Sequence, residues 1–134
     1  MELVFYCADP NDFSLGLLDH IVARVHAEKL VVCGSFKELR ASLLKPEYDF
    51  FAAILVVSSR RDLLDLLSIG EHLRSTRIIL ILPDREQETV SKGHALRPRF
   101  LTWPTGNSNE VIAVLAKMMS SAEECRGIRN NLDN

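Results

Sequence analysis

The side chains that could do chemistry are few and scattered in this chain. Its histidines and cysteines show neither a His pair at i, i+4 nor a C-x-x-C spacing, so they predict neither a metal site nor a redox pair. They are His20, His26, His72, His94, Cys7, Cys33 and Cys125. We also expect no serine beside a His and an acid at the predicted strand ends, and no paired carboxylates facing one cleft. The residue types therefore predict a protein that is not an enzyme, with structural histidines and no metal.

Composition sets the broad class. The 134 residues suffice for one domain, and a content of 47% hydrophobic and 25% charged residues is typical of globular proteins. A formal net charge of -2 lacks the excess of Lys and Arg that binds nucleic acid or an acidic membrane. The amino terminus "MELVFYCAD" has an acidic residue where a signal peptide needs a positive one, and its apolar stretch is too short for a membrane span. We expect a cytoplasmic protein with reduced thiols that binds neither nucleic acid nor membrane.

Five short apolar runs alternate with longer segments of helical period. The runs are rich in Val, Ile and Phe, and most read as strands that are covered on both faces of a parallel sheet. They span residues 3–7, 30–33, 50–57, 78–82 and 100–103, and a segment from 62 to 74 forms the third predicted helix. This order predicts a (βα)5 α/β domain, with a doubly wound, flavodoxin-like parallel sheet of five strands in the order 2-1-3-4-5.

Polar residues mark the predicted helix starts, which are Asp12, Ser35 with Glu38, Asp84 with Gln87, and Asn107 with Glu110. The fourth helix has only Val90 and Leu96 as strong apolar anchors and contains Gly93, so we expect it to be held weakly. The last helix loses its apolar period after Met119. Residues 123–134 are therefore expected to form a short helix extension or a disordered tail.

The alternation, the turn "CADPN" after the first strand and "LTWPT" after the fifth together resemble the receiver domain of two-component response regulators. The resemblance covers residues 2–122 and implies one receiver-like domain over residues 1–122. It also implies four features at the strand ends: an acidic pair that binds magnesium, a phosphate-accepting Asp, a Thr or Ser, and a Lys before Pro. All are needed because phosphoryl transfer to a carboxylate places negative charge beside negative charge.

This chain departs from the receiver pattern at each of these positions. With Pro10 aligned to the proline that often follows the acidic pair, the pair falls on Cys7 and Ala8, and only Asp9 remains nearby. The phosphoacceptor falls on Ser58, or on Val57 or Ser59 in a shifted register; the hydroxyl position falls on Leu82 or Pro83, and the lysine on Trp103. The resemblance therefore implies a pseudo-receiver, which keeps the fold and acts through protein contacts or a different ligand.

Several residues near these positions allow two interpretations. Trp103 is either an exposed anchor for a partner or a ring that fills the space of the missing lysine and metal. Ser58 and Ser59 either accept phosphate from a kinase or cap the following helix. Arg60 and Arg61 either hold an anionic partner or are solvated surface. The predicted pocket rim comprises Asp9, Ser59, Arg60 and Pro104.

A second motif gives an alternative function. The segment "TGNSNE", residues 105–110, is similar to the phosphate loop of flavodoxins, where backbone N–H groups at a helix start hold the flavin phosphate. In flavodoxins that loop follows the first strand, whereas here it follows the fifth, and Pro104 removes one N–H. A small-ligand or flavin-phosphate domain is thus the alternative; the pseudo-receiver interpretation requires no cofactor.

Receiver domains commonly dock partners and dimer mates on the face made by the fourth helix, the fifth strand and the fifth helix. A weakly held fourth helix could shift there at low cost. We expect a signalling protein or a second copy of this chain to bind this face, with Lys92, Trp103 and Lys117 as candidate contacts. Mutation of Lys92 or Lys117 should weaken that binding without unfolding the domain.

Overall fold

The computed structural model describes residues 2–25, 27, 29–104 and 108–132, with side chains described up to residue 122. Five parallel strands form one sheet in the order β2-β1-β3-β4-β5, which confirms the predicted fold class and strand order. The strands are β1 (Glu2–Cys7), β2 (Lys29–Cys33), β3 (Phe50–Val56), β4 (Arg77–Ile81) and β5 (Phe100–Thr102). The helices are α1 (Asp12–Arg24), α2 (Phe36–Leu44), α3 (Arg60–Ser68), the 3₁₀ helix η1 (Gly70–Leu73), α4 (Gln87–Ala95) and α5 (Asn109–Leu132).

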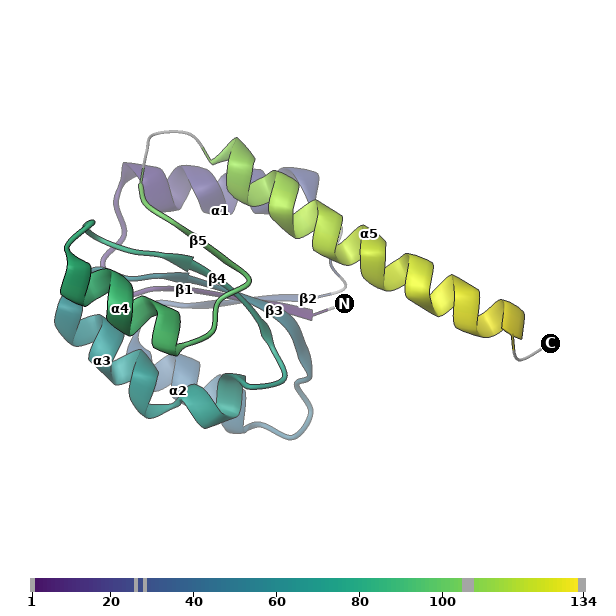
Figure 1. Ribbon diagram of the computed structural model, residues 1–134, viewed down its shortest axis with the longest axis horizontal. Coiled ribbons are helices and arrows are strands. Elements are labelled where there is room, and N and C mark those ends of the chain that lie inside the picture. The colour runs from purple at the N-terminus through teal and green to yellow at the C-terminus, as the bar shows by residue number, and fades with distance from the viewer. Residues whose placement is uncertain (1, 26, 28, 105–107, 133–134) are drawn as a thin grey trace.

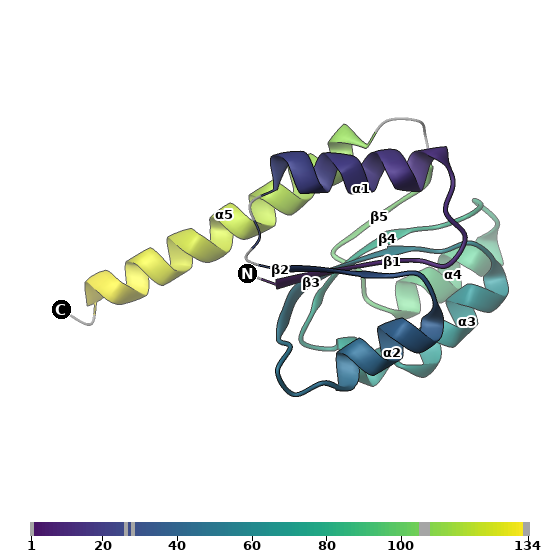
Figure 2. The ribbon, with the colours of Figure 1, turned by 180° about the vertical axis from the view of Figure 1, so that it is seen from behind.

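The helices cover both faces of the sheet. Figures 1 and 2 show α1 and α5 on one face and α2, α3 and α4 on the other. Successive strand residues therefore enter two separate cores: Tyr6 and Leu55 pack with the α2–α4 side, and Phe5 and Ile54 pack with the α1–α5 side. This explains why the central strands are apolar without alternation, because neither of their faces meets water.

The start of α1 differs from the prediction by one residue. Asn11, not Asp12, is the N-cap, because its side chain accepts a hydrogen bond from the Ser14 N–H at 2.9 Å. The Ser14 hydroxyl in turn accepts from the Asn11 N–H at 2.8 Å, which completes a capping box. Asp12 is the first helical residue, where its charge still favours the positive end of the helix.

The other helix starts follow the prediction in part. Ser35 caps α2 by accepting from the Glu38 N–H at 3.2 Å, while Glu38 accepts from the Gly34 N–H rather than from Ser35. The predicted Asp84 cap of α4 is wrong: the carboxylate of Asp84 accepts from the Glu86 N–H in the turn before the helix. Asn107, the predicted cap of the last helix, lies outside the described residues.

The third predicted helix is interrupted. It ends at Ser68, and the chain continues through Ile69 into η1, so the segment 62–74 is not one continuous helix. The 3₁₀ turn begins at Gly70, and glycine destabilises the interior of an α-helix more than any residue except proline.

Helix α4 is held by more than its apolar anchors. Gly93 is buried against β4, and a Cβ at this position would lie 3.2 Å from side-chain carbons of Leu80 and Leu82. A residue without a side chain therefore lets the helix lie close to the strand. In addition, the guanidinium of Arg60 on α3 pairs with Glu86 and, at 3.0 Å, with Glu88. The sequence-based expectation of a weakly held helix did not include these contacts.

Helix α5 continues through the predicted tail. Its backbone is helical to Leu132, and Figure 1 shows its carboxyl-terminal part projecting beyond the sheet. Of the two predicted alternatives for the tail, the structure thus has the helix extension up to this residue. Across the described chain, none of the helices combines the length and the apolar character that crossing a membrane requires.

Candidate functional site

A cavity of about 330 Å³ lies at the carboxyl ends of β1, β2 and β3, the edge where doubly wound sheets bind ligands. Residues from these strand ends, from the start of α2 and from the first two turns of α3 line it. They are Tyr6, Ala8, Asp9, Gly34, Ser35, Phe36, Ser58, Ser59, Arg61, Asp62 and Asp65. We call it the carboxyl-edge cavity.

A buried hydrogen-bonded group lies at the base of the carboxyl-edge cavity. The hydroxyl of the fully buried Tyr6 donates a hydrogen bond to one carboxylate oxygen of Asp62. The Ser58 N–H donates to the other oxygen at 3.0 Å. Asp62 is 8% exposed, so both oxygens of a nearly buried carboxylate are bonded. A buried charge is tolerated only with such partners, and its place in the first turn of α3 adds the favourable end of the helix dipole.

The environment of Tyr6 fixes its protonation state. Burial raises the pKa of the Tyr6 hydroxyl far above its ordinary value, and the hydrogen bond to the negative Asp62 raises that pKa further. Tyr6 therefore remains a neutral donor to Asp62 across the physiological pH range.

The residues that align with the receiver pattern lie in different surroundings in the structure. Ala8 and Asp9 line the cavity, whereas Cys7 is buried in the core beneath α1 and α5. Ser58 lies two residues after the end of β3, at the cavity. Leu82 is fully buried, and its N–H donates to the Thr102 carbonyl at 2.9 Å.

The expectation that no paired carboxylates face one cleft was wrong, because Asp9, Asp62 and Asp65 all line this cavity. They do not form a metal centre: within the described part of the chain, no group of three or more Asp, Glu, His or Cys residues is arranged to hold an ion. Asp62 is also occupied by Tyr6 and Ser58. The cavity is therefore acidic without an evident ligand set for a cation.

Of the two serines, Ser59 is the cap of α3. Its hydroxyl accepts from the Asp62 N–H at 3.2 Å, as the capping interpretation predicted. Arg61 lines the cavity, but Arg60, which we placed on its rim, instead pairs with Glu86, just before α4, and with Glu88 in its first turn.

Trp103 is half-buried and packs against the core beneath α2, α3 and α4. Its indole N–H donates to the Asp84 carbonyl at 2.6 Å, and the Arg85 guanidinium lies over the ring, 4.2 Å from its centroid. Trp103 and Pro104 are not among the described residues that line the carboxyl-edge cavity. The indole is thus a packing residue fixed to the loop before α4, with part of its surface exposed.

The remaining predicted residues lie on the helices and the fifth loop. Lys92 pairs with Glu88 one turn earlier at 2.9 Å, and Lys117 is exposed on α5. In the "TGNSNE" segment, residues 105–107 lie outside the described residues. Ser108 is buried, and its hydroxyl is hydrogen-bonded to Nδ1 of His20 on α1, which agrees with a structural role for that histidine.

Sequence reasoning missed the pair of Tyr6 and Asp62. The only local signal was the S-x-x-D spacing of Ser59 and Asp62, which marks a helix start, and a lone hydroxyl inside an apolar strand. The partners are 56 residues apart, so only the fold brings them together.

The strand order and the cavity at the carboxyl ends define an α/β, flavodoxin-like fold of the receiver type. Among solved structures, the chain is similar to the RcsB response regulator of Salmonella typhimurium, a protein described for its conformational dynamism in DNA interaction. The TM-score is 0.70 at 15% sequence identity, over 90% of this chain and 62% of that chain. No protein-family model matches the sequence, and a search of curated proteins finds no match. The similarity therefore shows a receiver-like fold, and this chain spans less than two thirds of that regulator.

Proposed function

We propose that this chain is an atypical receiver-type domain, a non-catalytic pseudo-receiver of two-component-type signalling that acts through protein contacts instead of aspartyl phosphorylation. The proposal rests on the identity of the residues that follow β3. There Val57, Ser58 and Ser59 follow the strand, and none of them offers the carboxylate that would accept a phosphoryl group.

The nearest buried carboxylate is a poor substitute acceptor. Asp62 already accepts hydrogen bonds from Tyr6 and from the Ser58 backbone, which lowers the nucleophilicity of both oxygens. Transfer to it would also bring a phosphoryl group beside the carboxylates of Asp9 and Asp65. Among the described residues that line this cavity, Arg61 alone is cationic, so charge neutralisation would be incomplete.

A protein partner is proposed to dock across the edge of the sheet at β5. This strand is at the end of the strand order, between α4 and α5 (Figure 1). The partly exposed Trp103 follows it, and the two flanking helices supply Lys92 and Lys117. An aromatic ring with flanking cations is a composition common at protein interfaces, and the partner is a signalling protein or a second copy of the chain.

The first test is an amide chemical-shift titration of the ¹⁵N-labelled chain with magnesium and beryllofluoride, a mimic of the acyl phosphate. We expect no saturable movement at Asp9, Ser58 or Asp62. Magnesium alone is the matched control, since it separates simple cation attraction by the acidic cavity from acyl-phosphate mimicry. Saturable shifts that need beryllofluoride would overturn the proposal.

The second test concerns the docking face. Light scattering across a concentration series would detect a second copy as the partner. Lys92→Glu or Lys117→Glu should then shift the chain towards monomer without unfolding the domain. A chain that is monomeric throughout would exclude the second copy and leave a different signalling protein as the partner.

A further inference from the structure

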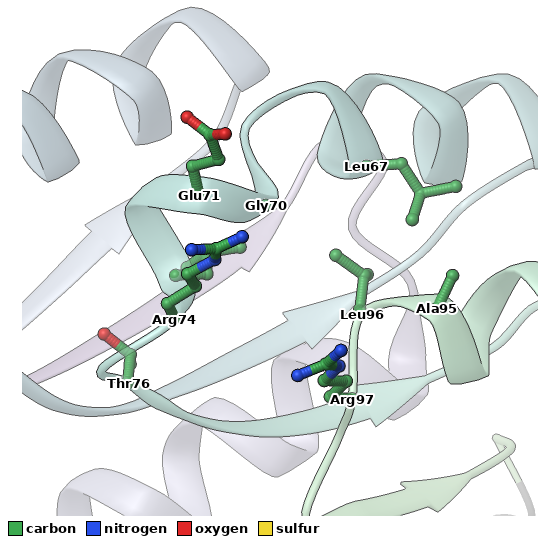
Figure 3. A pocket seen from close by; sticks show the side chains of 9 residues that line it. Leu67, Gly70, Glu71, Arg74, Thr76, Ala95, Leu96 and Arg97 are labelled. Atoms are coloured by element: carbon green, nitrogen blue, oxygen red, sulfur yellow. The ribbon is translucent and has the colours of Figure 1, made fainter.

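A second cavity, of about 620 Å³, lies at the opposite edge of the sheet, where the chain enters β4 and β5. We call it the amino-edge cavity. Figure 3 shows it between η1 and the carboxyl end of α4, with Leu67 and Leu96 on its apolar side. Leu73 also lines the cavity. Its volume is within the usual range for small-molecule sites.

Two arginines face this cavity from different elements. Arg74 directly follows η1, Arg97 follows α4, and Figure 3 shows their side chains on two sides of the same opening. Both are exposed, and neither guanidinium has a hydrogen bond or an ion pair with any residue that the structure describes. Glu71 also lines the cavity, but its carboxylate points away from Arg97 (Figure 3). Both guanidinium groups are therefore available to donate hydrogen bonds to an anion at this cavity.

The backbone of Arg97 supplies an independent observation. Among the described residues other than glycine, it alone has a positive φ, of 55°. Its N–H donates to the His94 carbonyl at 2.9 Å and so ends α4 in the left-handed conformation, for which glycine is the usual residue. Such conformations cost free energy and concentrate at ligand sites. The carboxyl end of a helix favours cations, but this preference does not explain why Arg97 stands where glycine would be unstrained.

We propose that the amino-edge cavity binds a small amphipathic anion, whose carboxylate or phosphate group lies between Arg74 and Arg97. Its apolar body would lie on the half-buried Leu67, behind which Leu73 and Leu96 are 2% and 6% exposed, and the Thr76 hydroxyl, also at the cavity, is a further donor. This site is separate from the carboxyl-edge cavity, and it does not depend on whether the domain is a pseudo-receiver.

The test is a titration of the ¹⁵N-labelled full chain with octanoate, and in a separate arm with inorganic phosphate. We expect saturable shifts of the Gly70, Thr76 and Leu96 amides with octanoate. Arg74→Ala and Arg97→Gly should each weaken that binding about tenfold, because each removes one charged donor. Arg97→Gly also relieves the positive φ, so its weaker binding cannot be attributed to unfolding, and Arg74→Ala provides a second, independent variant.

Arg99→Ala is the matched control, since Arg99 is an exposed cation two residues further along that does not line the cavity. Its octanoate affinity should equal that of the unmodified chain. If inorganic phosphate shifts the same amides in its own arm, the site accepts a phosphate head group. If octanoate binds and phosphate causes no shifts, the site is selective for a carboxylate. The proposal is overturned if neither probe gives saturable shifts, if both cavity variants bind octanoate normally, or if Arg99→Ala weakens binding as much as they do.

Discussion

The two cavities at opposite edges of the sheet differ in how their charged groups are satisfied. At the carboxyl edge, Tyr6 and the Ser58 N–H both donate to Asp62, so both oxygens of this buried carboxylate are bonded. The exposed Asp9, Arg61 and Asp65, by contrast, have no side-chain partner among the described residues. At the amino edge, Arg74 and Arg97 have no partner among the described residues. Buried polar groups that satisfy one another contribute to folding, whereas charges left facing a cavity can bind a ligand. The buried carboxylate at the edge where this fold usually binds ligands thus has a structural role here, while both unpaired arginines at the amino edge remain open to a ligand.

The largest expected effect tests the structural role of the carboxyl-edge cavity. Asp62→Ala leaves the Tyr6 hydroxyl and the Ser58 N–H without their acceptor. We expect a loss of about 3 kcal/mol in the free energy of unfolding, since a buried donor bears its full desolvation cost. Urea denaturation followed by circular dichroism measures this.

Asp65→Ala is the matched control, because Asp65 is an exposed carboxylate on the same helix that lines the same cavity. It should change stability by less than about 0.5 kcal/mol, as surface substitutions do. Equal effects of the two variants would mean that the Tyr6–Asp62 hydrogen bond is not structural.

A second prediction uses the protonation of Tyr6. Tyr6→Phe should cost about 1 to 2 kcal/mol at neutral pH because it removes one hydrogen bond to a charged acceptor. The folded-state pKa of Tyr6 is raised above its unfolded value of 10.0, so its stabilising contribution is present below about pH 10 and is lost as the pH rises further. The difference in unfolding free energy between the chain and Tyr6→Phe should therefore narrow above pH 10. A constant difference would contradict a raised pKa.

The third prediction concerns α4, whose end forms one side of the amino-edge cavity. A Cβ at Gly93 would press on Leu80 and Leu82, so Gly93→Ala should destabilise the domain by about 1 kcal/mol despite its better helix propensity. Gly16→Ala on α1 is the control, since nothing lies within 4 Å of the added Cβ and propensity alone should stabilise it by about 0.5 to 1 kcal/mol. Thermal unfolding of both variants separates the steric effect at Gly93 from the effect of helix propensity at Gly16. If both variants are stabilised, α4 does not pack tightly against Leu80 and Leu82.

The sequence allowed the fold to be predicted because burial on both faces leaves a local pattern. Each strand appears as an apolar run, and alternating runs and helices leave few topologies. The residue that caps a helix was harder to predict from the sequence. Asn11 and Asp12 are both good capping residues, and only the bonds of Ser14 show which one is used.

The two cavities were predictable to different degrees. Since strand ends meet at one edge, the residues at Ser58 and Trp103 could be compared with the receiver pattern from sequence alone. The bond of Tyr6 to Asp62 joins distant segments and leaves no local periodicity. The amino-edge cavity was not anticipated, because neither a positive φ at Arg97 nor an unpaired Arg74 can be read from residue types.

The smallest expected effect tests whether the amino edge carries strain. Arg97→Gly and Arg97→Ala both remove the guanidinium, but only glycine adopts a φ of 55° without cost. We expect Arg97→Gly to be more stable than Arg97→Ala by about 0.5 to 1 kcal/mol, measured by urea denaturation. The comparison of two substitutions at one position cancels the loss of charge and isolates the backbone term. Equal stabilities would mean that arginine occupies this position without strain, and the contrast between the two edges would then rest on the unpaired charges alone.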